Sequence, residues 1–370
     1  MKVLNLLTVG GLGGIEILNY DFGTYSSVEQ GFAFLFGTGA TYERMKAAGY
    51  KVYDLSNMKP KICLNRFKKL SNIAEEYDLI VVHHGDPYLK FFFNYLVAYK
   101  NKKGLVFIHS CWDDNLFFPS SKIKHFIGKK IFQKSMDIAQ KVVFVSEAGK
   151  KSYDNNFKLK DNTTVIYNGI GEDKIIDGQS NVLSGSNTTR IVYVGRLENI
   201  KGVDLLIEAI GKIKDLHSVK VTIVGGGSQK KKLEELTSKL NLAELISFVG
   251  PQSDVKPYLK ASDVFVYPSR CQEVFGISIV EAMAYGLICV ANNVGGIPEV
   301  IEDSENGFLN ITNDVTGLVK CLDNAIKALN SEKGEYISIK AKETAKNYSI
   351  TNTCNKLDCL YGELVSNDDI

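Results

Sequence analysis

Residues 190–202 read RIVYVGRLENIKG, an apolar run followed by a glycine and a polar loop that closes on a second glycine. Four consecutive apolar residues at 191–194, of which three are β-branched and one is aromatic, are typical of a buried strand. Gly195 and Gly202 bracket the turn into the next element. With a helix expected after Gly202, the segment has the strand–loop–helix order of a parallel α/β sheet.

The same order recurs on both sides of this segment. Strands of a first series are expected at 2–8, 31–36, 51–55, 79–83, 105–109, 142–146 and 164–167, and those of a second at 190–195, 220–225, 246–250, 264–267 and 287–291. From 310 onward the chain is expected to be helical, with helices at 315–329, 334–347 and 351–364. The sequence therefore predicts an α/β protein with two Rossmann-like domains that face each other across a cleft, and with C-terminal helices.

Residues 171–189 are polar, contain three glycines and show no periodicity, so they are the expected domain boundary. We predict a first Rossmann-like domain at 1–170, a linker at 171–189 and a second Rossmann-like domain at 190–345. Residues 346–370 are expected to form a helix that can pack back on the first domain.

The composition excludes several classes of protein. The chain has 370 residues, 45% of them hydrophobic and 23% charged, and its net charge of +2 favours neither nucleic acid nor an anionic surface. Seven scattered cysteines without a C-x-x-C pair argue against disulfides and zinc, and favour the cytoplasm. Residues 1–9 resemble a first strand rather than a signal peptide, and no apolar stretch reaches the roughly 20 residues of a membrane span.

Ligands of such sheets bind beyond the carboxyl ends of the strands, so the loops there are the candidate sites. In residues 10–16, GGLGGIE, Gly13 and Gly14 would let backbone N–H groups and a helix N-terminus approach a ligand. A tight turn without a ligand is the alternative. His109 ends an apolar strand and is expected to have a functional role in the cleft; the alternative is a histidine packed for structural reasons. His83 and His84 follow a strand in a similar way, but their functional role is less favoured.

Arg196 and Lys201 lie five residues apart in the loop after the strand at 190–195. A planar guanidinium and a mobile ammonium can converge on a diphosphate, although ordinary surface charges remain the alternative. The glycine turn at 224–228 is compatible with phosphate, a nucleoside or no ligand.

Residues 273–281, EVFGISIVE, carry two carboxylates. Gly276 is expected to end the loop and Ser278 to begin a helix, which places Glu273 in the loop and Glu281 in the first helical turn. One carboxylate can then reach a sugar and the other a ribose, while nearby backbone N–H groups meet a phosphate. Alternatively, Ser278 and Glu281 form a capping box, which would leave Glu273 unexplained.

These residues resemble glycosyltransferase family 4, the retaining enzymes of the two-domain GT-B architecture. Glu273 and Glu281 fit its E-x7-E signature, and Arg196 and Lys201 fit its glycine–arginine–leucine and lysine–glycine element. Residues 13–16, 168–170 and 295–299 are similar to its G-G-x-E, N-G-V/I and G-G-x-P-E motifs.

The resemblance implies that the domain at 1–170 binds the acceptor and that the domain at 190–345 binds the nucleotide sugar. It also implies a role for each matching residue. Arg196 and Lys201 would neutralise the donor pyrophosphate, Glu281 would bind the ribose, Glu273 the donor sugar, and His109 would face the sugar ring. Glu273, His109, Arg196 and Lys201 form the implied catalytic set. The implied donor-binding set is Gly13, Gly14, Arg196, Lys201, Gln252, Glu273, Phe275, Gly276, Ile277, Ser278 and Glu281, with Gln252 beside the base.

The implied reaction is retaining transfer of a hexose or N-acetylhexosamine from a nucleoside-diphosphate sugar, with UDP expected, to a glycan or lipid-linked glycan in bacterial-type surface polysaccharide synthesis. No metal and no cofactor are expected, since no D-x-D motif or compact His/Asp/Glu cluster is present. Two alternatives stay open: a non-hydrolysing nucleotide-sugar epimerase of the same architecture, and a non-catalytic sugar-nucleotide-binding partner subunit.

Residues 122–134 interleave cations with apolar residues at helical spacing, and 88–103 combine FFF at 91–93 with three lysines near the end. Such a helix can lie on an anionic membrane, which would place the protein at the inner face of the membrane. A helix packed on the first domain's core is the alternative. Residues 19–40 match no family pattern, so the acceptor side stays open.

Overall fold

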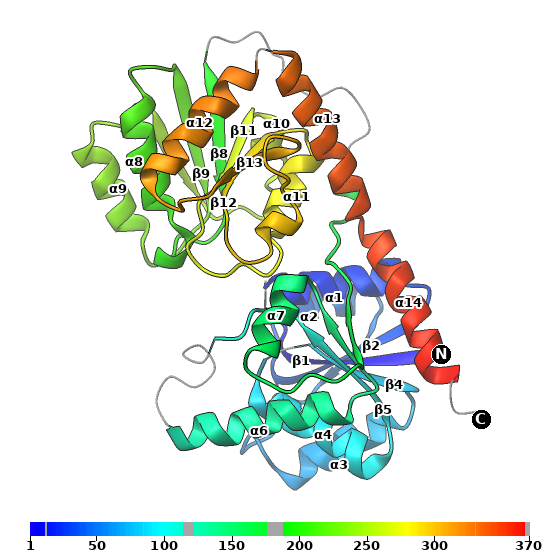
Figure 1. The fold of residues 1–370 in the computed structure, drawn as a ribbon. Helices are drawn as coiled ribbons and strands as arrows, with labels where there is room; N and C mark the ends of the chain where they lie inside the picture. Colours follow the sequence, from blue (N-terminus) through cyan, green and yellow to red (C-terminus); the bar gives the residue numbers. More distant parts are fainter. Residues whose placement is uncertain (12, 84, 114–121, 176–187, 330, 367–370) are drawn as a thin grey trace. The chain divides into compact units, whose positions relative to one another are not determined.

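The computed structural model describes residues 1–370 except 12, 84, 114–121, 176–187, 330 and 367–370. Most of the predicted linker therefore lies outside the described residues, as do Leu12 and His84 of the predicted loops. The chain divides into two compact units, Met1–Gly169 with Ile350–Ile370, and Ile170–Ser349. Each unit contains one parallel sheet covered by helices (Figure 1), which confirms the predicted α/β class with two Rossmann-like domains.

The first unit is built on a seven-stranded sheet in the order β3-β2-β1-β4-β5-β6-β7. Its strands are β1 (Lys2–Val9), β2 (Glu29–Gly37), β3 (Lys51–Asp54), β4 (Leu79–Val82), β5 (Lys103–Ile108), β6 (Lys141–Phe144) and β7 (Thr163–Val165). Its helices are α1 (Gly14–Tyr25), α2 (Ala40–Ala47), α3 (Leu64–Ala74), α4 (Pro87–Lys100), α6 (Lys122–Ile138), α7 (Glu147–Asp154) and α14 (Ile350–Ser366). Residues 19–40, unmatched in the sequence, include most of α1 and all of β2, which pairs with β1.

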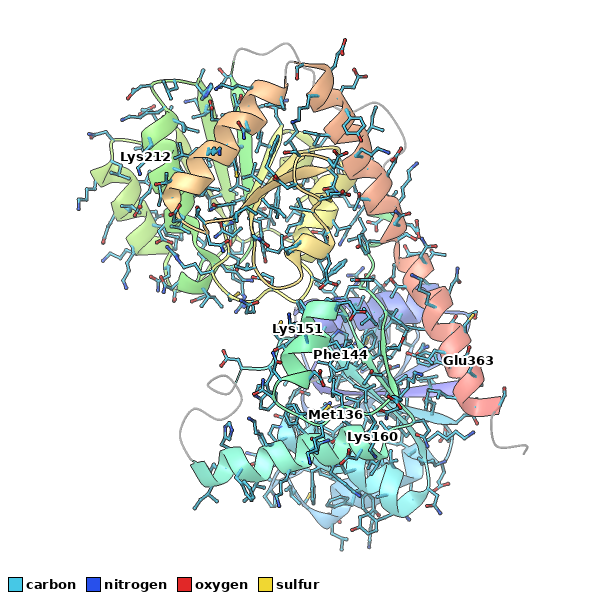
Figure 2. All side chains as sticks on the ribbon, viewed as in Figure 1. Met136, Phe144, Lys151, Lys160, Lys212 and Glu363 are labelled. Carbon is cyan, nitrogen blue, oxygen red and sulfur yellow. The ribbon has the colours of Figure 1, made fainter. Side chains whose placement is uncertain are left out.

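Apolar side chains of the first sheet and of the covering helices form one large core cluster. Met136 of α6 and Phe144 of β6, labelled in Figure 2, both belong to it. Asp86 begins α4, because its carboxylate accepts hydrogen bonds from the backbone of Tyr88 and Leu89 at 2.8 and 3.0 Å. The cap fixes where α4 starts, directly after the loop that follows β4.

The last helix, α14, belongs to the first unit although it follows the second in sequence. Asp358 accepts hydrogen bonds from the hydroxyls of Ser26 and Ser27 at 2.6 and 2.7 Å. Lys103 donates to the backbone carbonyls of Leu364 and Val365 at 2.9 Å. These contacts join α14 to the end of α1 and to the start of β5.

The second unit has a six-stranded sheet in the order β10-β9-β8-β11-β12-β13. Its strands are β8 (Thr189–Val194), β9 (Val219–Val224), β10 (Ile246–Gly250), β11 (Val264–Tyr267), β12 (Ile288–Asn292) and β13 (Gly307–Asn310). Its helical elements are η1 (Glu172–Lys174), η3 (Asn199–Lys201), α8 (Val203–Ile213), α9 (Lys230–Lys239), α10 (Lys256–Lys260), α11 (Ile277–Ala284), η4 (Ile297–Glu299), α12 (Val315–Leu329) and α13 (Glu332–Asn347).

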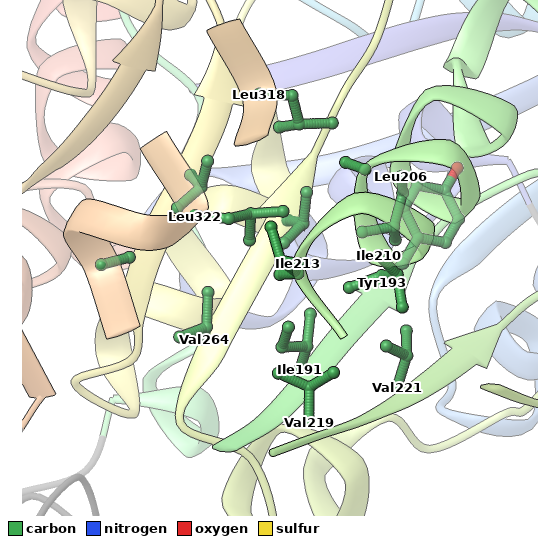
Figure 3. Packing of buried hydrophobic residues seen from close by; sticks show 14 of the residues in the cluster. Ile191, Tyr193, Leu206, Ile210, Ile213, Val219, Val221, Val264, Leu318 and Leu322 are labelled. Atoms are coloured by element: carbon green, nitrogen blue, oxygen red, sulfur yellow. The ribbon is translucent and has the colours of Figure 1, made fainter. Parts of the chain in front are cut away.

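The strand β13 was not predicted. Its four residues, GFLN, contain no β-branched side chain, so they give little strand signal, yet all four are buried and pair with β12. The core on one side of this sheet is shown in Figure 3, where Ile191 of β8 and Val221 of β9 belong to the same buried cluster as Leu206 and Ile210 of α8. The helix α8 thereby covers the strands that carry the loop at 195–202.

Both sheets reverse their strand order beside the first strand of the unit. In the first unit β1 lies between β2 and β4, and in the second β8 lies between β9 and β11. The loops that leave the carboxyl ends of such neighbouring strands run in opposite directions, which opens a binding position between them. The loops after β8 and β11 carry Lys201 and Glu273, two of the predicted site residues.

Candidate functional site

The centre of the site is an ion pair between Lys201 and Glu273. The Lys201 Nζ lies 2.6 Å from Glu273 Oε1, and the two side chains are 12% and 13% exposed. Lys201 also donates a hydrogen bond to the hydroxyl of Tyr267 at 3.2 Å. Because β8 and β11 are paired neighbours in the sheet, residues 72 positions apart in sequence meet at its carboxyl edge.

The Glu273 carboxylate is held in its ionised form. Ser269 and Cys271 donate hydrogen bonds to the same oxygen, Oε1, at 2.6 and 3.1 Å. Burial, the largest single influence, raises the pKa of Glu273, but Lys201 and these two donors together outweigh it and leave the pKa below its usual value. A negative charge is thereby kept at a shielded position beside its cation.

The loop that carries Glu273 is fixed through its backbone. The Gly296 N–H donates to the Glu273 carbonyl oxygen at 2.6 Å. Gly295 has φ +56°, and a Cβ on it would overlap that same carbonyl oxygen. Asn292 donates to the carbonyls of Pro268 and Ser269, each at 3.0 Å. The G-G-x-P-E turn at 295–299 therefore has a packing role, as the support of the Glu273 loop.

Arg196 lies on the same loop as Lys201 but is exposed. Its backbone carbonyl accepts a hydrogen bond from the Tyr193 hydroxyl at 2.9 Å, and no ion pair joins its guanidinium to another described residue. A Cβ on Gly225 or Gly227 would overlap the carbonyl oxygen of Gly195 or Leu197. The glycine turn at 224–228 is thus explained by close backbone packing against the Arg196 loop.

The helix α11 begins one residue earlier than predicted, and the capping box, the alternative considered for Ser278 and Glu281, does not form. Gly276, with φ +84°, is the N-cap residue, no side chain caps the helix, and Ile277 is its first residue. Ser278 is therefore the second residue of the helix, and Glu281 lies beyond the first turn. Instead of capping, Glu281 Oε1 pairs with Lys174 Nζ at 2.5 Å.

Two other predicted donor residues have mainly local contacts. The Phe275 side chain is 1% exposed and packs edge-on against Tyr348 at 5.1 Å between ring centroids. Only its backbone is therefore a candidate for ligand contact. Gln252 is exposed, and its side-chain amide donates to the carbonyl of Val249 at 3.0 Å. No contact in the described part of the chain joins it to Lys201 or Glu273.

In the first unit, Gly13 is the N-cap residue of α1 and Gly14 is its first residue. A Cβ on Gly14 would meet nothing within 4 Å, whereas one on Gly13 would overlap the Glu16 carboxylate. Glu16, 6% exposed, already brings a negative charge to this helix terminus. The terminus is consequently better suited to a hydroxyl group than to a second anion.

His109 follows β5 and makes a hydrogen bond with His83, which follows β4. The Nε2 of His109 lies 3.0 Å from Nδ1 of His83, and Nε2 of His83 lies 2.9 Å from Oδ1 of Asn5 in β1. His83 and Asn5 are 1% and 0% exposed. The histidine predicted as functional is thus attached to a buried polar chain that crosses three neighbouring strands.

Sequence reasoning missed several residues that shape the site. Asn5 is a polar residue inside the apolar strand β1, and Asn292 is the polar last residue of β12, so both positions carry a signal that could have singled them out. Ser269, Cys271 and Lys174 carry no such signal, since they lie in loops rich in polar residues. Among the described residues no group of three His, Cys, Asp or Glu side chains is placed to hold a metal ion.

Comparison with known proteins covers both halves of the chain. Residues 34–174 match the model of Glycosyltransferase Family 4, and residues 179–344 match that of Glycosyl transferases group 1. Both halves of the chain therefore match glycosyltransferase models, which supports a transferase enzyme.

The chain is 34% identical over 180 residues to an uncharacterized glycosyltransferase, MJ1607, of Methanocaldococcus jannaschii. The alignment covers 45% of this chain and 46% of that protein. It is 32% identical over 143 residues to N-acetyl-alpha-D-glucosaminyl L-malate synthase of Bacillus anthracis, 39% of this chain and 36% of the relative. The chain thus spans less than half the length of these two curated relatives.

A crystal structure of Anabaena Alr3699/HepE in complex with UDP and glucose has the same fold. The TM-score is 0.82 at 22% identity, with 98% of this chain and 99% of the other covered. This likeness supports the two-domain GT-B architecture.

Proposed function

We propose that the protein transfers a hexose or N-acetylhexosamine, with retention of anomeric configuration, from a UDP-sugar to a glycan or lipid-linked glycan. The observation that carries the proposal is the shielded Lys201–Glu273 pair at the strand reversal of the second unit, with Arg196 on the same loop. A cytoplasmic reaction in the synthesis of surface polysaccharide fits this chemistry.

The hydrogen bonds of Glu273 leave one oxygen for a substrate. Its three described partners, Lys201, Ser269 and Cys271, all bind Oε1. Oε2 can therefore accept a hydrogen bond from a hydroxyl of the donor sugar while the rest of the carboxylate stays fixed. Because the Glu273 carboxylate is already fixed as a hydrogen-bond acceptor, it needs little reorganisation when the sugar reacts.

Lys201 and Arg196 are proposed to bind the diphosphate. An ammonium has three N–H donors, and two are used, on Glu273 and on the Tyr267 hydroxyl. The third remains for a phosphate oxygen. Arg196, exposed on the same loop, supplies a planar pair of donors suited to the same group.

Glu281 is proposed to bind the ribose in the same manner as Glu273 binds the sugar. Its Oε1 is held by Lys174, so Oε2 can accept from the ribose hydroxyls. Backbone N–H groups of residues 275–278, at the start of α11, are proposed to approach the phosphates. Gln252, at the end of β10, is proposed to lie beside the base.

In the proposed reaction the bond between the anomeric carbon and the β-phosphate oxygen breaks, and a bond to the acceptor oxygen forms on the same face. The acceptor hydroxyl gives its proton to the leaving phosphate. Lys201 and Arg196 stabilise the charge that develops on the diphosphate. His109 is proposed to contact the sugar ring from the first unit, and the Gly14 terminus a sugar hydroxyl.

The test is incubation with UDP-glucose, UDP-galactose or UDP-N-acetylglucosamine, each with and without an acceptor glycan. Heat unfolding is used first to choose the donor, since a ligand that binds the folded state raises the midpoint. We expect an acceptor-dependent product whose anomeric proton shows the configuration of the donor. Conversion of UDP-N-acetylglucosamine to its 2-epimer without acceptor would instead establish the epimerase.

We further propose that α6 contacts an anionic membrane. At its start Ile123, Phe126 and Ile127 are 73%, 60% and 52% exposed, and Lys130 lies over the Phe126 ring at 4.8 Å. Apolar side chains interleaved with lysines suit the interface of an anionic bilayer. No helix in the described ranges is long and apolar enough to span a membrane.

The second stretch predicted for the membrane, 88–103, contributes less than expected. Phe92 and Phe93 of α4 are fully buried in the core of the first unit, because α4 packs against α6 and the sheet. Only Tyr88, Phe91 and Tyr99 remain as large exposed apolar side chains of this helix.

A further inference from the structure

The buried polar chain behind His109 fixes the orientation of one amide. Asn5 Nδ2 lies 3.2 Å from the backbone carbonyl oxygen of Gly31 and 2.7 Å from Gln30 Oε1. A backbone carbonyl can only accept a hydrogen bond, so the Asn5 nitrogen must face Gly31. The Asn5 oxygen therefore faces His83.

The direction of each following hydrogen bond is then determined. Asn5 Oδ1 can only accept, so the proton of this 2.9 Å contact sits on His83 Nε2. A neutral His83 with its proton on Nε2 has its lone pair on Nδ1. The 3.0 Å contact between this Nδ1 and His109 Nε2 consequently needs the proton of His109 on Nε2.

If His83 Nδ1 instead donated to His109 Nε2, His83 would have to be positively charged, because only an imidazolium donates from both nitrogens. His83 is 1% exposed, and burial disfavours the charged form of an imidazole. Its cavity is also lined by Lys90, which is 2% exposed. Burial lowers the pKa of Lys90 to about 7, which shows how strongly this environment opposes a cation. The same burial disfavours a cation at His83.

We propose that His83 and Asn5 are positioning residues that keep a proton on Nε2 of His109, so that the neutral His109 ring has its lone pair on Nδ1. A histidine fixed in this way keeps its ring plane. The two rings are also stacked, with centroids 5.3 Å apart and an interplanar angle of 21°. The consequence for catalysis rests on the proposed role of His109 in sugar transfer.

The direct test is long-range proton–nitrogen correlation NMR on the full-length protein labelled with ¹⁵N-histidine, in the absence of substrate. The chain has only five histidines, so single substitutions assign each signal. We expect both His83 and His109 to be protonated at Nε2 alone. A His109 protonated at Nδ1, or an imidazolium at His83, would overturn the tautomer assignment.

A matched pair of variants tests the positioning role. His83→Gln keeps one acceptor for His109 and one donor for Asn5, whereas His83→Phe keeps an aromatic ring and removes both. We expect His83→Phe to raise the Nδ1–H population of His109 and to lower kcat about tenfold at unchanged donor KM, the order of effect of losing the orienting partner of a functional histidine. His83→Gln should retain most of the activity.

Equal kcat values for wild type and His83→Phe, despite a changed tautomer, would contradict the positioning role. If His83→Phe does not fold, Asn5→Leu replaces it, since it removes the acceptor of the first hydrogen bond and leaves both imidazoles in place. Absence of transfer by the wild-type protein with every donor would contradict the proposed function, and the NMR result would still decide the tautomer.

Discussion

The substitution Gly295→Ala tests whether the 295–299 turn supports the Glu273 loop. Gly295 has φ +56°, which costs an alanine about 1 kcal/mol. The new Cβ would also overlap the Glu273 carbonyl, so the hydrogen bond from the Gly296 N–H must break or shift, at about another 1 kcal/mol. We expect a total loss of about 2–3 kcal/mol in the stability of the second unit.

Gly250→Ala is the matched control. Gly250 also has a positive φ, +76°, and lies in the same unit, but a Cβ there would meet nothing within 4 Å. Gly250→Ala is expected to lower the free energy of unfolding only through the strain of an alanine at a positive φ, by about 1 kcal/mol. Comparison of the two variants therefore separates backbone strain from the displacement of Glu273.

Hydrogen exchange resolved by peptide measures the free energy of local opening in both variants. It reports the opening of β11 and α11 separately from that of the first unit. Gly295→Ala should lower protection in the loop at 268–276 more than Gly250→Ala does. It should also weaken binding of the UDP-sugar. Equal protection in the two variants, with donor affinity unchanged by Gly295→Ala, would refute the support role.

Three further predictions concern charges and an exposed ring. Lys201→Met should weaken UDP binding at least tenfold in calorimetry. It should also reverse the pH dependence of stability that Glu273 contributes. In the wild type the lowered Glu273 pKa contributes stability that is lost as pH falls below about 4.5, whereas an unpaired buried carboxyl loses stability as pH rises. Lys90→Met should stabilise the first unit by a few kcal/mol at pH 7, as measured by unfolding followed through the fluorescence of the single tryptophan, Trp112. Because the Lys90 pKa is lowered, the unfolded chain binds more protons than the folded one between about pH 7 and 10.5, so the stability difference between variant and wild type should shrink as pH rises. A difference that stays constant with pH would contradict the prediction. Phe126→Asp should reduce co-sedimentation with vesicles containing anionic lipid and leave heat unfolding unchanged; equal sedimentation would remove α6 as the contact.

The architecture followed from the sequence because parallel strands are short, apolar and separated by helices, so periodicity and glycine turns mark them clearly. The helix at 315–329 was predicted with the bounds that α12 has. The strand β13 was missed because GFLN owes its strand form to pairing with β12, a long-range contact that a local pattern does not contain.

The proximity of Lys201 and Glu273 was only partly predictable. The loops were identified from the rule that ligands bind at the carboxyl ends of strands, but the pairing of β8 with β11 decides that these two loops meet. The partners of Glu273 on Oε1 depend on side-chain directions inside one short loop. No periodicity encodes these directions.

The alternative capping box is absent for a related reason. Ser278 and Glu281 have the correct spacing, but Gly276 adopts a left-handed conformation that starts the helix one residue earlier than expected. Lys174, distant in sequence, then takes the Glu281 carboxylate. A local motif was overruled by a backbone conformation and by a tertiary ion pair.

In the proposed site the Glu273 carboxylate binds the donor sugar, while Lys201 and Arg196 bind the diphosphate. Glu273→Gln separates these functions, because the amide keeps the size of the side chain and removes its charge. UDP lacks the donor sugar, so its affinity for the variant should stay within about threefold of wild type, whereas kcat with the UDP-sugar should fall on the order of 100-fold. Unchanged kcat in Glu273→Gln would contradict the account.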